Sequence, residues 1–433
     1  MIAILNKMIW AVATGLLVIA SIYFSKHLSF LQFNFYKMGK ALFQRKEKKE
    51  GISPFRTLML TLAGRIGVGS IAGIALAIAL GGIGSLFWIW VMAIFAAILG
   101  YGETVLAILY RKKDGDQFVG GPSYYMRDGL GWKKLGGLYA IFILLSYIGG
   151  FLGIQANTIT KSLHSIVVIS PWLIGFILVL ITAFIIFGGL ERISNFTAKI
   201  VPVMAGFYLL LVGYILVKHH AALPHLFQMI LADAFHFDSF LSGFLPTFFI
   251  GIQRGIFSNE AGLGTGSITA STSGTNSPSS QGYLQVLGIY ITSLLICSAT
   301  AFFVLTSDYQ TVAVSDLNGV EMVASAFQYH FGSIGPYFLF FFILLFSFST
   351  ILTGYYDGES SLKYFWLHPR RWILFGLKIV TLGMIFLGCI LSSTSLWDMV
   401  DLLVGVLAIL NLLAMFCLRK ELFREATKKE RKD

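Results

Sequence analysis

Residues 64–73 read GRIGVGSIAG and residues 251–266 read GIQRGIFSNEAGLGTG. Both stretches place glycines, polar side chains and charges inside segments that are otherwise apolar enough to cross a bilayer. A helix that loses its backbone hydrogen bonds in lipid leaves polar groups unsatisfied, at a cost of several kcal/mol each. Such interruptions are tolerated where they line a site for a solute or an ion. We therefore predict two broken membrane helices at the functional centre.

The composition is that of a multispanning membrane protein. Of 433 residues, 56% are hydrophobic and only 12% are charged, and the mean hydropathy is +0.78. A span requires about 20 predominantly apolar residues. The predicted spans are eleven in number: 2–24, 54–80, 83–110, 135–163, 171–189, 198–217, 240–271, 281–306, 334–364, 372–391 and 397–418.

The basic residues indicate how the spans are oriented. The net charge of +11 is compatible with a nucleic-acid partner, but the Lys and Arg residues are grouped in alternate loops. Seven lie between positions 26 and 49, six between 111 and 134, and seven at the end of the chain. By the positive-inside rule, the N-terminus is expected outside the cell membrane and the C-terminus in the cytoplasm, with no nucleic-acid partner. A basic cluster that follows the first span favours an uncleaved anchor over a cleaved signal peptide.

The spacing of the interruptions predicts an internal repeat. Without the first span, ten remain, and the interrupted segments are the first and sixth of these. Because five is an odd number, the second unit must be inverted with respect to the first. The predicted fold is an all-α integral membrane protein with an inverted five-plus-five repeat and one additional N-terminal helix. Its predicted parts are an N-terminal helix with a basic loop (1–50), the first repeat (51–218), an outer loop (219–239), the second repeat (240–418) and a basic tail (419–433).

Two connections occupy equivalent places in the predicted repeats. Each follows the second helix of its unit, at residues 111–134 on the inner side and 307–333 on the outer side. Each is long enough to contain a short helix or a lid.

The first interruption offers groups for both ends of an amino-acid zwitterion. If the helix unwinds at residues 67–70, the free amides of Ile71, Ala72 and Gly73 would hold a carboxylate. The free carbonyls at residues 63–66 suit an ammonium group or sodium.

The second interruption supplies similar groups for a zwitterion through Ser258, Asn259 and the carbonyls around Ala261. Together the two interruptions predict a small site in the middle of the membrane for a zwitterion and a cation.

Four ionisable residues lie at membrane depth, where charged side chains usually face a cavity or each other. They are Arg65, Glu103, Arg254 and Glu260. We interpret Arg254 and Glu260 as braces of the second interruption or as gates to it. Purely structural ion pairs are the alternative.

Other interpretations of these residues remain open. Gly67, Gly69 and Gly73 form GxGxxxG, which differs from the dinucleotide fingerprint and is not followed by a βαβ pattern. Small residues also allow close helix packing. The hydroxyls of Ser349 and Thr350 are suited to a sodium shell, or to bonding their own helix. No nucleophile, base and orienting group recur at a plausible spacing, so an enzyme is not expected.

Several motifs resemble those of the alanine or glycine:cation symporters of bacteria and archaea. The resemblance runs from about residue 54 to the last span, and its most specific motif is RGIFSNEAGLG from Arg254. Further motifs are GVGSIAGIALAIALGGIGSLFWIW from Gly67, GETVLAILYR from Gly102, GGPSYYM from Gly120, QANTI from Gln155, STIL with YYDGE from Ser349, and WDMVDLLVG and LNLLA in the last span. The family shares the fold of the amino-acid/polyamine/organocation transporters. The resemblance implies sodium-coupled uptake of alanine or glycine by alternating access, or proton-coupled uptake, with no cofactor besides the coupling ion.

The resemblance also implies roles for individual residues. Ser349 and Thr350 would bind sodium with the carbonyls of Ala63 and Ile66, and Gln155 would belong to the substrate pocket. The full set of predicted substrate contacts is Gly67, Gly69, Ser70, Ile71, Ala72, Gly73, Leu76, Gln155, Ser258, Asn259 and Gly354.

The chain departs from the usual family pattern at four positions. The family usually has Asn at Ser70, Thr at Leu76, Trp at Gly354 and Pro at Leu410. Loss of an indole at Gly354 predicts a larger pocket, so a larger neutral amino acid such as glutamine is the alternative substrate. A membrane receptor or channel without coupled transport is the alternative class.

Overall fold

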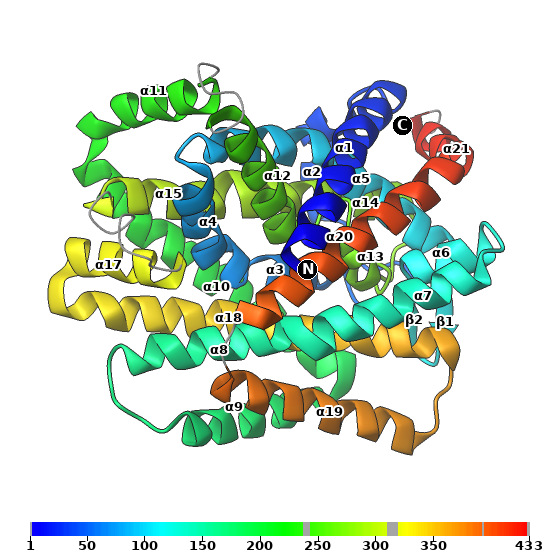
Figure 1. The fold of residues 1–433 in the computed structure, drawn as a ribbon. Coiled ribbons are helices and arrows are strands. Elements are labelled where there is room, and N and C mark those ends of the chain that lie inside the picture. The colour runs from blue at the N-terminus through cyan, green and yellow to red at the C-terminus, as the bar shows by residue number, and fades with distance from the viewer. Residues whose placement is uncertain (1, 237–242, 310–318, 392–393, 431–433) are drawn as a thin grey trace.

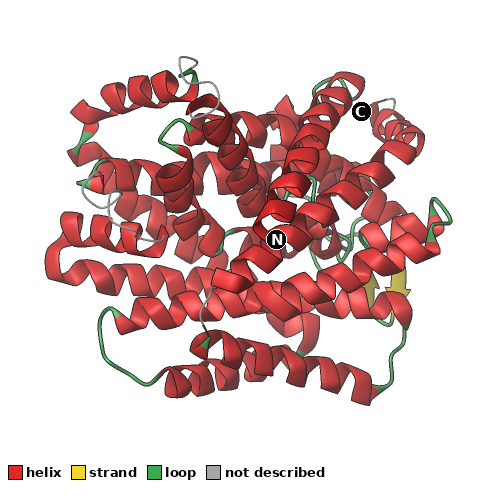
Figure 2. Ribbon diagram, viewed as in Figure 1, coloured by secondary structure: helices red, strands yellow, loops and turns green. Residues whose placement is uncertain are grey.

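The computed structural model describes residues 2–236, 243–309, 319–391 and 394–430. These residues are almost entirely helical, apart from one short two-stranded hairpin (Figure 2). Within the described ranges, nine helices or helical runs are long and apolar enough to cross a membrane. The prediction of an all-helical, multi-pass membrane protein is therefore confirmed.

The first half of the chain contains a membrane helix, a short basic segment and five helical units. Its elements are α1 (Ile2–His27), η1 (Leu31–Phe33), α2 (Phe35–Leu42), α3 (Pro54–Arg65), α4 (Val68–Gly81), α5 (Ser85–Leu109), β1 (Lys112–Asp114), β2 (Gln117–Val119), α6 (Pro122–Asp128), α7 (Lys133–Ile143), η2 (Leu144–Phe151), α8 (Leu152–His164), α9 (Pro171–Ile186) and α10 (Gly189–Lys218).

The second half contains the other interrupted helix and the helices that follow it. Its elements are η3 (His220–Ala222), α11 (Leu223–Ala234), α12 (Leu245–Asn259), α13 (Thr265–Ala270), α14 (Pro278–Tyr290), η6 (Ile291–Cys297), α15 (Ser298–Leu305), α17 (Gly319–Phe331), η7 (Gly332–Ile334), α18 (Gly335–Phe365), α19 (Arg371–Ile390), α20 (Thr394–Cys417) and α21 (Arg419–Glu430). Two helical runs contain a wider π-helical segment, η2 and η6.

Ser-Pro dipeptides start helices in both halves. Ser53 accepts a hydrogen bond from the amide of Arg56 at the start of α3, and Ser277 accepts one from Ser280 at the start of α14. Proline follows each serine at the first helical position, where it has no amide hydrogen to lose.

Two of the predicted spans are not among the nine long apolar runs. Residues 171–189 contain α9, an apolar helix of only 16 residues. Residues 240–271 contain α12 and α13, which are separated by the predicted interruption. The first residues of that span, 240–242, lie outside the described ranges, as do the predicted boundary at 239–240 and residues 310–318 of the outer connection.

Helices from corresponding parts of the two predicted repeats pack against each other. α4 contacts α12, α5 contacts α14, α8 contacts α18 and α9 contacts α19. Figure 1 shows α9 and α19 together at the lower edge of the molecule, beneath α8 and α18. α1 lies outside these pairs and packs on α5 and α20.

Both long connections contain a short helix, as predicted. The connection after α5 forms the β1–β2 hairpin and α6, and the connection after α15 contains α17, which packs on α4 and α18. In Figure 1, α11 and α17 lie at the left of the molecule, whereas β1, β2, α6 and α21 lie at the right.

Arg111 holds the segment that follows α13. Its guanidinium donates to the carbonyls of Ser271, Ser273 and Thr275 at 3.1, 2.5 and 2.9 Å. Burial lowers the pKa of Arg111 to about 10, so the side chain is still protonated at neutral pH and keeps all its donors.

Candidate functional site

The first interrupted helix breaks over two residues. α3 ends at Arg65, Ile66 and Gly67 leave the helix, and α4 begins at Val68. The amide of Val68 donates to Oε1 of Gln155 at 3.2 Å. The Nε2 atom of Gln155 is buried and has no hydrogen-bond partner among the described residues. The break therefore has an unused side-chain amide donor next to it.

The position of this break corrects the sequence prediction. Unwinding at 67–70 would leave free amides at Ile71, Ala72 and Gly73, but α4 already begins at Val68. Those three amides lie inside α4, and the first amides of the helix are those of Val68 and Gly69. The prediction was wrong because each residue left out of a buried helix adds unsatisfied backbone groups, so the helix resumes as soon as Gly67 has turned the chain.

α18 approaches the carbonyl end of the break. Oγ1 of Thr350 lies 2.8 Å from the carbonyl oxygen of Ala63 and 2.9 Å from that of Phe346 in its own helix, and its single hydrogen can be donated to either. A Cβ atom at Gly67 would lie 2.5 Å from the same Oγ1, so glycine is required for this approach. The hydroxyl of Ser349 donates to Phe346 at 2.9 Å, within its own helix. The structure thus brings Thr350 and Ala63 together, and it leaves the Ser349 hydroxyl bonded inside α18.

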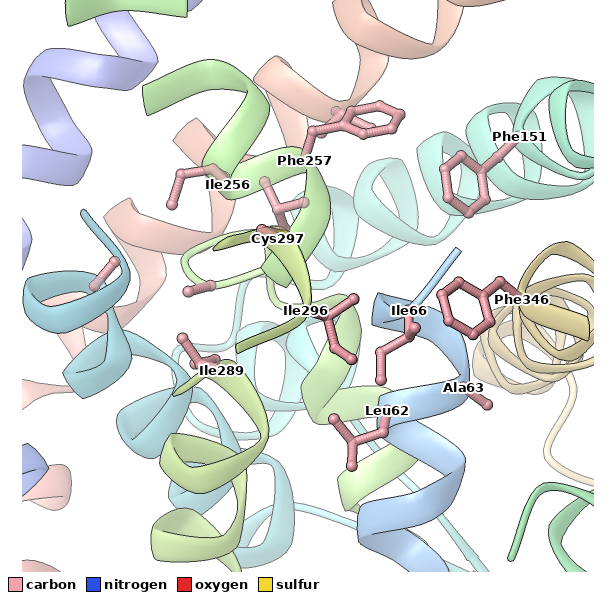
Figure 3. Close-up of a cluster of buried hydrophobic side chains, with 14 of the residues drawn as sticks. Leu62, Ala63, Ile66, Phe151, Ile256, Phe257, Ile289, Ile296, Cys297 and Phe346 are labelled. Carbon is pink, nitrogen blue, oxygen red and sulfur yellow. The ribbon is translucent and has the colours of Figure 1, made fainter. Parts of the chain in front are cut away.

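Apolar side chains surround the breaks (Figure 3). Ile66, the residue that follows α3, is fully buried, and Figure 3 shows it with Phe346 in this cluster. The rings of Phe151 and Phe257 lie 5.7 Å apart, in an edge-to-face arrangement. These side chains exclude water from the backbone groups that the breaks expose, which strengthens their electrostatic interactions.

The second interrupted helix breaks over five residues, and its backbone is held by a side chain. α12 ends at Asn259, and Glu260, Gly262 and Gly264 have positive φ angles of 58°, 87° and 88°. The Asn259 side chain accepts from the amide of Ala261 at 2.9 Å and donates to Ser293 at 2.9 Å. Asn259 therefore fixes the shape of this break.

The two breaks meet through a pair of serines. Oγ of Ser70 in α4 and Oγ of Ser258 in α12 lie 2.9 Å apart. The Ser70 hydroxyl also bonds the carbonyl of Arg65 at 3.1 Å, and Ser258 Oγ lies 3.2 Å from the sulfur of Cys297. One buried polar network therefore links α3, α4, α12 and η6.

Arg254 does not pair with Glu260. Its Nη2 donates to Oδ2 of Asp401, in α20, at 2.7 Å, while Glu260 accepts from the hydroxyl of Tyr147, in η2, at 2.7 Å. The two charged residues thus tie opposite sides of the second break to different helices.

Arg65 is buried between the breaks. Its Nη1 donates to the carbonyl of Gln285 at 3.2 Å, and the carboxylates of Glu260 and Glu103 lie within range of its charge. Glycines at 266 and 288 make room for it, because a Cβ atom there would lie 2.6 and 2.9 Å from the guanidinium nitrogens.

Glu103 braces the second break from the side of α5. It accepts from Nδ2 of Asn411 at 2.7 Å and from the backbone amides of Gly262 and Gly264. Asn411 also donates to the carbonyl of Gly262 at 2.9 Å. Glu103 therefore holds the segment of Gly262 and Gly264 in place, a role that the sequence did not indicate.

The space expected beside Gly354 is already filled. A Cβ atom at this position would lie 2.8 Å from Cδ2 of Leu152 and 3.3 Å from Cδ1 of Tyr147. The predicted enlargement is therefore wrong at this point. Leu76 is half-buried in α4 and lies under α17, because a Cβ atom at Gly319 would contact its amide nitrogen at 3.1 Å.

Sequence reasoning missed Asp401, Tyr147 and Asn411. Asp401 carried a usable signal, since an acidic residue within the span 397–418 needs a partner at membrane depth. Tyr147 and Asn411 gave no such signal in the sequence, because neutral polar residues in a membrane helix most often form hydrogen bonds within their own helix.

These features define a class of protein. The chain is a multi-pass membrane protein whose polar site lies where two helices are interrupted, and this architecture is that of secondary transporters. The sequence profile of the sodium:alanine symporter family matches residues 1–433. The chain belongs to this family, which is one of symporters and not of enzymes.

Curated relatives match nearly the whole chain. A probable sodium/glutamine symporter, GlnT of Bacillus subtilis, is 36% identical over 428 residues, which cover 98% of this chain and 88% of the relative. The amino-acid carrier protein AlsT of the same species is 34% identical, with 96% and 88% covered. The sodium/alanine symporter AgcS of Methanococcus maripaludis is 31% identical over 446 residues, with 99% and 98% covered.

Proposed function

We propose that the chain takes up a small neutral amino acid, alanine or glycine, together with sodium by alternating access across the cell membrane. The observation that carries the proposal is the contact between the two breaks, where Ser70 and Ser258 lie 2.9 Å apart. A solute bound there touches both interrupted helices, so a movement of one relative to the other transfers it between the two sides.

The breaks supply groups of both polarities for a zwitterion. The carboxylate is assigned to the amide of Gly69, in the first turn of α4, and to the free Nε2 of Gln155, because the amide of Val68 already donates to Oε1 of Gln155. The ammonium group is assigned to free carbonyls at the end of α3 and to the hydroxyls of Ser70 and Ser258. Asn259 acts on the substrate by shaping the second break.

The sodium ion is assigned to the carbonyl end of α3. The carbonyls of Ala63 and Ile66 and the hydroxyls of Ser349 and Thr350 are hard oxygen donors of the kind that sodium prefers. The bond from Thr350 to Ala63, at 2.8 Å, supports this assignment because two of the four groups already converge. Ser349 requires a rotation of its hydroxyl away from Phe346.

The coupling is energetically adequate. One sodium ion that moves down 100 mV gains about 2.3 kcal/mol, and a tenfold concentration ratio adds about 1.4 kcal/mol. The sum supports a roughly several-hundred-fold accumulation of the substrate.

We assign the chain eleven spans and an inverted five-plus-five repeat. The contacts of α4 with α12, α5 with α14, α8 with α18 and α9 with α19 support this symmetry, since each pairs equivalent helices. The proposed repeats are residues 51–218 and 240–418, flanked by 1–50, 219–239 and 419–433. The predicted outer connections contain α11 and α17, whereas the predicted inner connection contains β1, β2 and α6, and the basic tail contains α21. In Figure 1 these two groups lie at opposite sides of the molecule, which supports an outer N-terminus and a cytoplasmic C-terminus.

Glutamine is the second candidate substrate, and protons are the second candidate coupling ion. GlnT is named a probable sodium/glutamine symporter, and a further relative, YrbD of Bacillus subtilis, is named a putative sodium/proton-dependent alanine carrier. Uptake by the purified protein in liposomes distinguishes these possibilities. Labelled alanine, glycine and glutamine are offered in sodium buffer and in choline buffer, each with and without a pH gradient.

The proposal predicts alanine or glycine uptake that collapses when choline replaces sodium. Asn259→Ala is expected to abolish this uptake while the protein still inserts into the membrane. Flux that follows the amino-acid gradient without any ion gradient would instead indicate a channel and overturn the proposal. Sodium-dependent uptake of labelled glutamine without uptake of alanine or glycine would transfer the assignment to glutamine.

A further inference from the structure

A groove beside α7 combines a basic end with an apolar wall. It has a volume of about 530 Å³ and lies between the end of α6, the start of α7 and the end of α18. Lys133 and Lys134 line it at the start of α7, and Leu138, Ile141 and Phe365 line its apolar part. None of these residues belongs to the two breaks, so amino-acid transport does not account for the groove.

The apolar wall faces outward from the protein. Leu138 is 40% exposed, Ile141 is 43% exposed and Phe365 is 39% exposed. Lys134, Leu138 and Ile141 follow one another at helical spacing on one face of α7. Because α7 begins the candidate span Lys133–His164, the lysines lie at the end of the span and the apolar stripe extends into the bilayer.

The two lysines are unfavourably placed for the helix itself. They are the first two residues of α7, at the end where the macrodipole disfavours cations. Both are exposed, and neither has an acidic partner within the described part of the chain. Arg127, in contrast, is paired with Asp128 at 2.9 Å. An anion at this point would be stabilised by both ammonium groups and by the positive end of the helix dipole.

We propose that this groove binds an anionic phospholipid, with its phosphate at Lys133 and Lys134 and its acyl chains along Leu138 and Ile141. Basic pockets at the ends of membrane helices are suited to anionic headgroups. The apolar wall favours a lipid over a free phosphate ion, which would leave that wall unused. Gly137 keeps the groove open, because a Cβ atom there would lie 3.5 Å from the ring of Phe365, and a larger side chain would fill the space.

Native mass spectrometry of the purified protein in detergent tests the proposal. The protein is titrated separately with phosphatidylglycerol and phosphatidylcholine of identical acyl chains. We expect phosphatidylglycerol to bind more tightly, and Lys133→Gln combined with Lys134→Gln to weaken it roughly thirtyfold, from about 1 kcal/mol for each lysine. The matched control combines Arg370→Gln with Arg371→Gln, which removes two charges at the start of α19 and should leave this binding unchanged.

A second variant tests the apolar part of the groove without a change in charge. Gly137→Leu fills the groove and is expected to weaken phosphatidylglycerol binding, whereas Gly137→Ala fits at ordinary contact distance and should preserve it. Equal binding of the two lipids, or full binding by the double lysine variant, would overturn the proposal. Displacement of phosphatidylglycerol by millimolar inorganic phosphate would also overturn it, because the site would then be one for a small anion.

Discussion

Arg254 and Asp401 form a buried ion pair that joins α12 to α20. Their charged atoms lie 2.7 Å apart, and the side chains are only 9% and 5% exposed. The indole of Trp10, in α1, donates to the backbone carbonyl of Asp401 at 2.9 Å. The first half of the second interrupted helix is therefore fixed against both the last membrane helix and the N-terminal helix, which lies outside the proposed repeats.

Removal of one partner of this pair should destabilise the protein strongly. Asp401→Asn leaves Arg254 buried without its counter-charge, and the loss of a partner from a buried pair costs about 3–5 kcal/mol. We expect a clear decrease in the melting temperature of the purified protein. Asp398→Asn, at an exposed position of the same helix, should change stability by less than about 0.5 kcal/mol. Equal melting of both variants would show that the ion pair does not hold α12.

The hydroxyl of Thr350 should affect sodium affinity in particular. Thr350→Val keeps the shape of the side chain but removes the oxygen that reaches Ala63, and we expect about a tenfold increase in the sodium concentration for half-maximal uptake, equivalent to about 1.4 kcal/mol. Thr353→Val is the matched control. Thr353 is also in α18, and its hydroxyl lies 3.3 Å from the carbonyl of Leu60, which is in α3 with Ala63. Its sodium dependence should stay close to that of the wild type. A similar increase in both variants would argue for a packing effect.

The sequence predicted the interrupted helices because glycines together with charges are costly, and therefore rare, inside a segment that crosses the membrane. It also identified Thr350 and Ala63, whose proximity the structure supports. Details that depend on the neighbours of a residue were not predictable. The end of the first break is set by the cost of unpaired backbone in a buried helix, and the space at Gly354 is filled by Leu152 from a different helix. The partner of Arg254 lies 147 positions away, and the local pattern around Arg254 contains no information about it.

Gly69 and Gly73 should respond differently to substitution. A Cβ atom at Gly69 would lie 3.3 Å from the ring of Phe257 and 3.6 Å from the Cα atom of Ser258, so Gly69→Leu forces the two breaks apart. We expect it to abolish uptake without preventing membrane insertion. Gly73→Ala should preserve uptake, because the nearest atom would be 4.0 Å away and the Gly73 amide lies inside α4. Loss of uptake in Gly73→Ala would show that transport needs the space beside Gly73.

Gly354 and Leu152 should be energetically coupled. A Cβ atom at Gly354 would lie 2.8 Å from Leu152, so Gly354→Ala overpacks this contact and should cost about 1–3 kcal/mol. Leu152→Ala alone leaves a cavity and should cost about 2–5 kcal/mol. The double variant is expected to be less destabilised than the sum of the single variants, because each change relieves the other. Melting temperatures of the four proteins measure this coupling, and strictly additive effects would mean that Leu152 does not occupy the space beside Gly354.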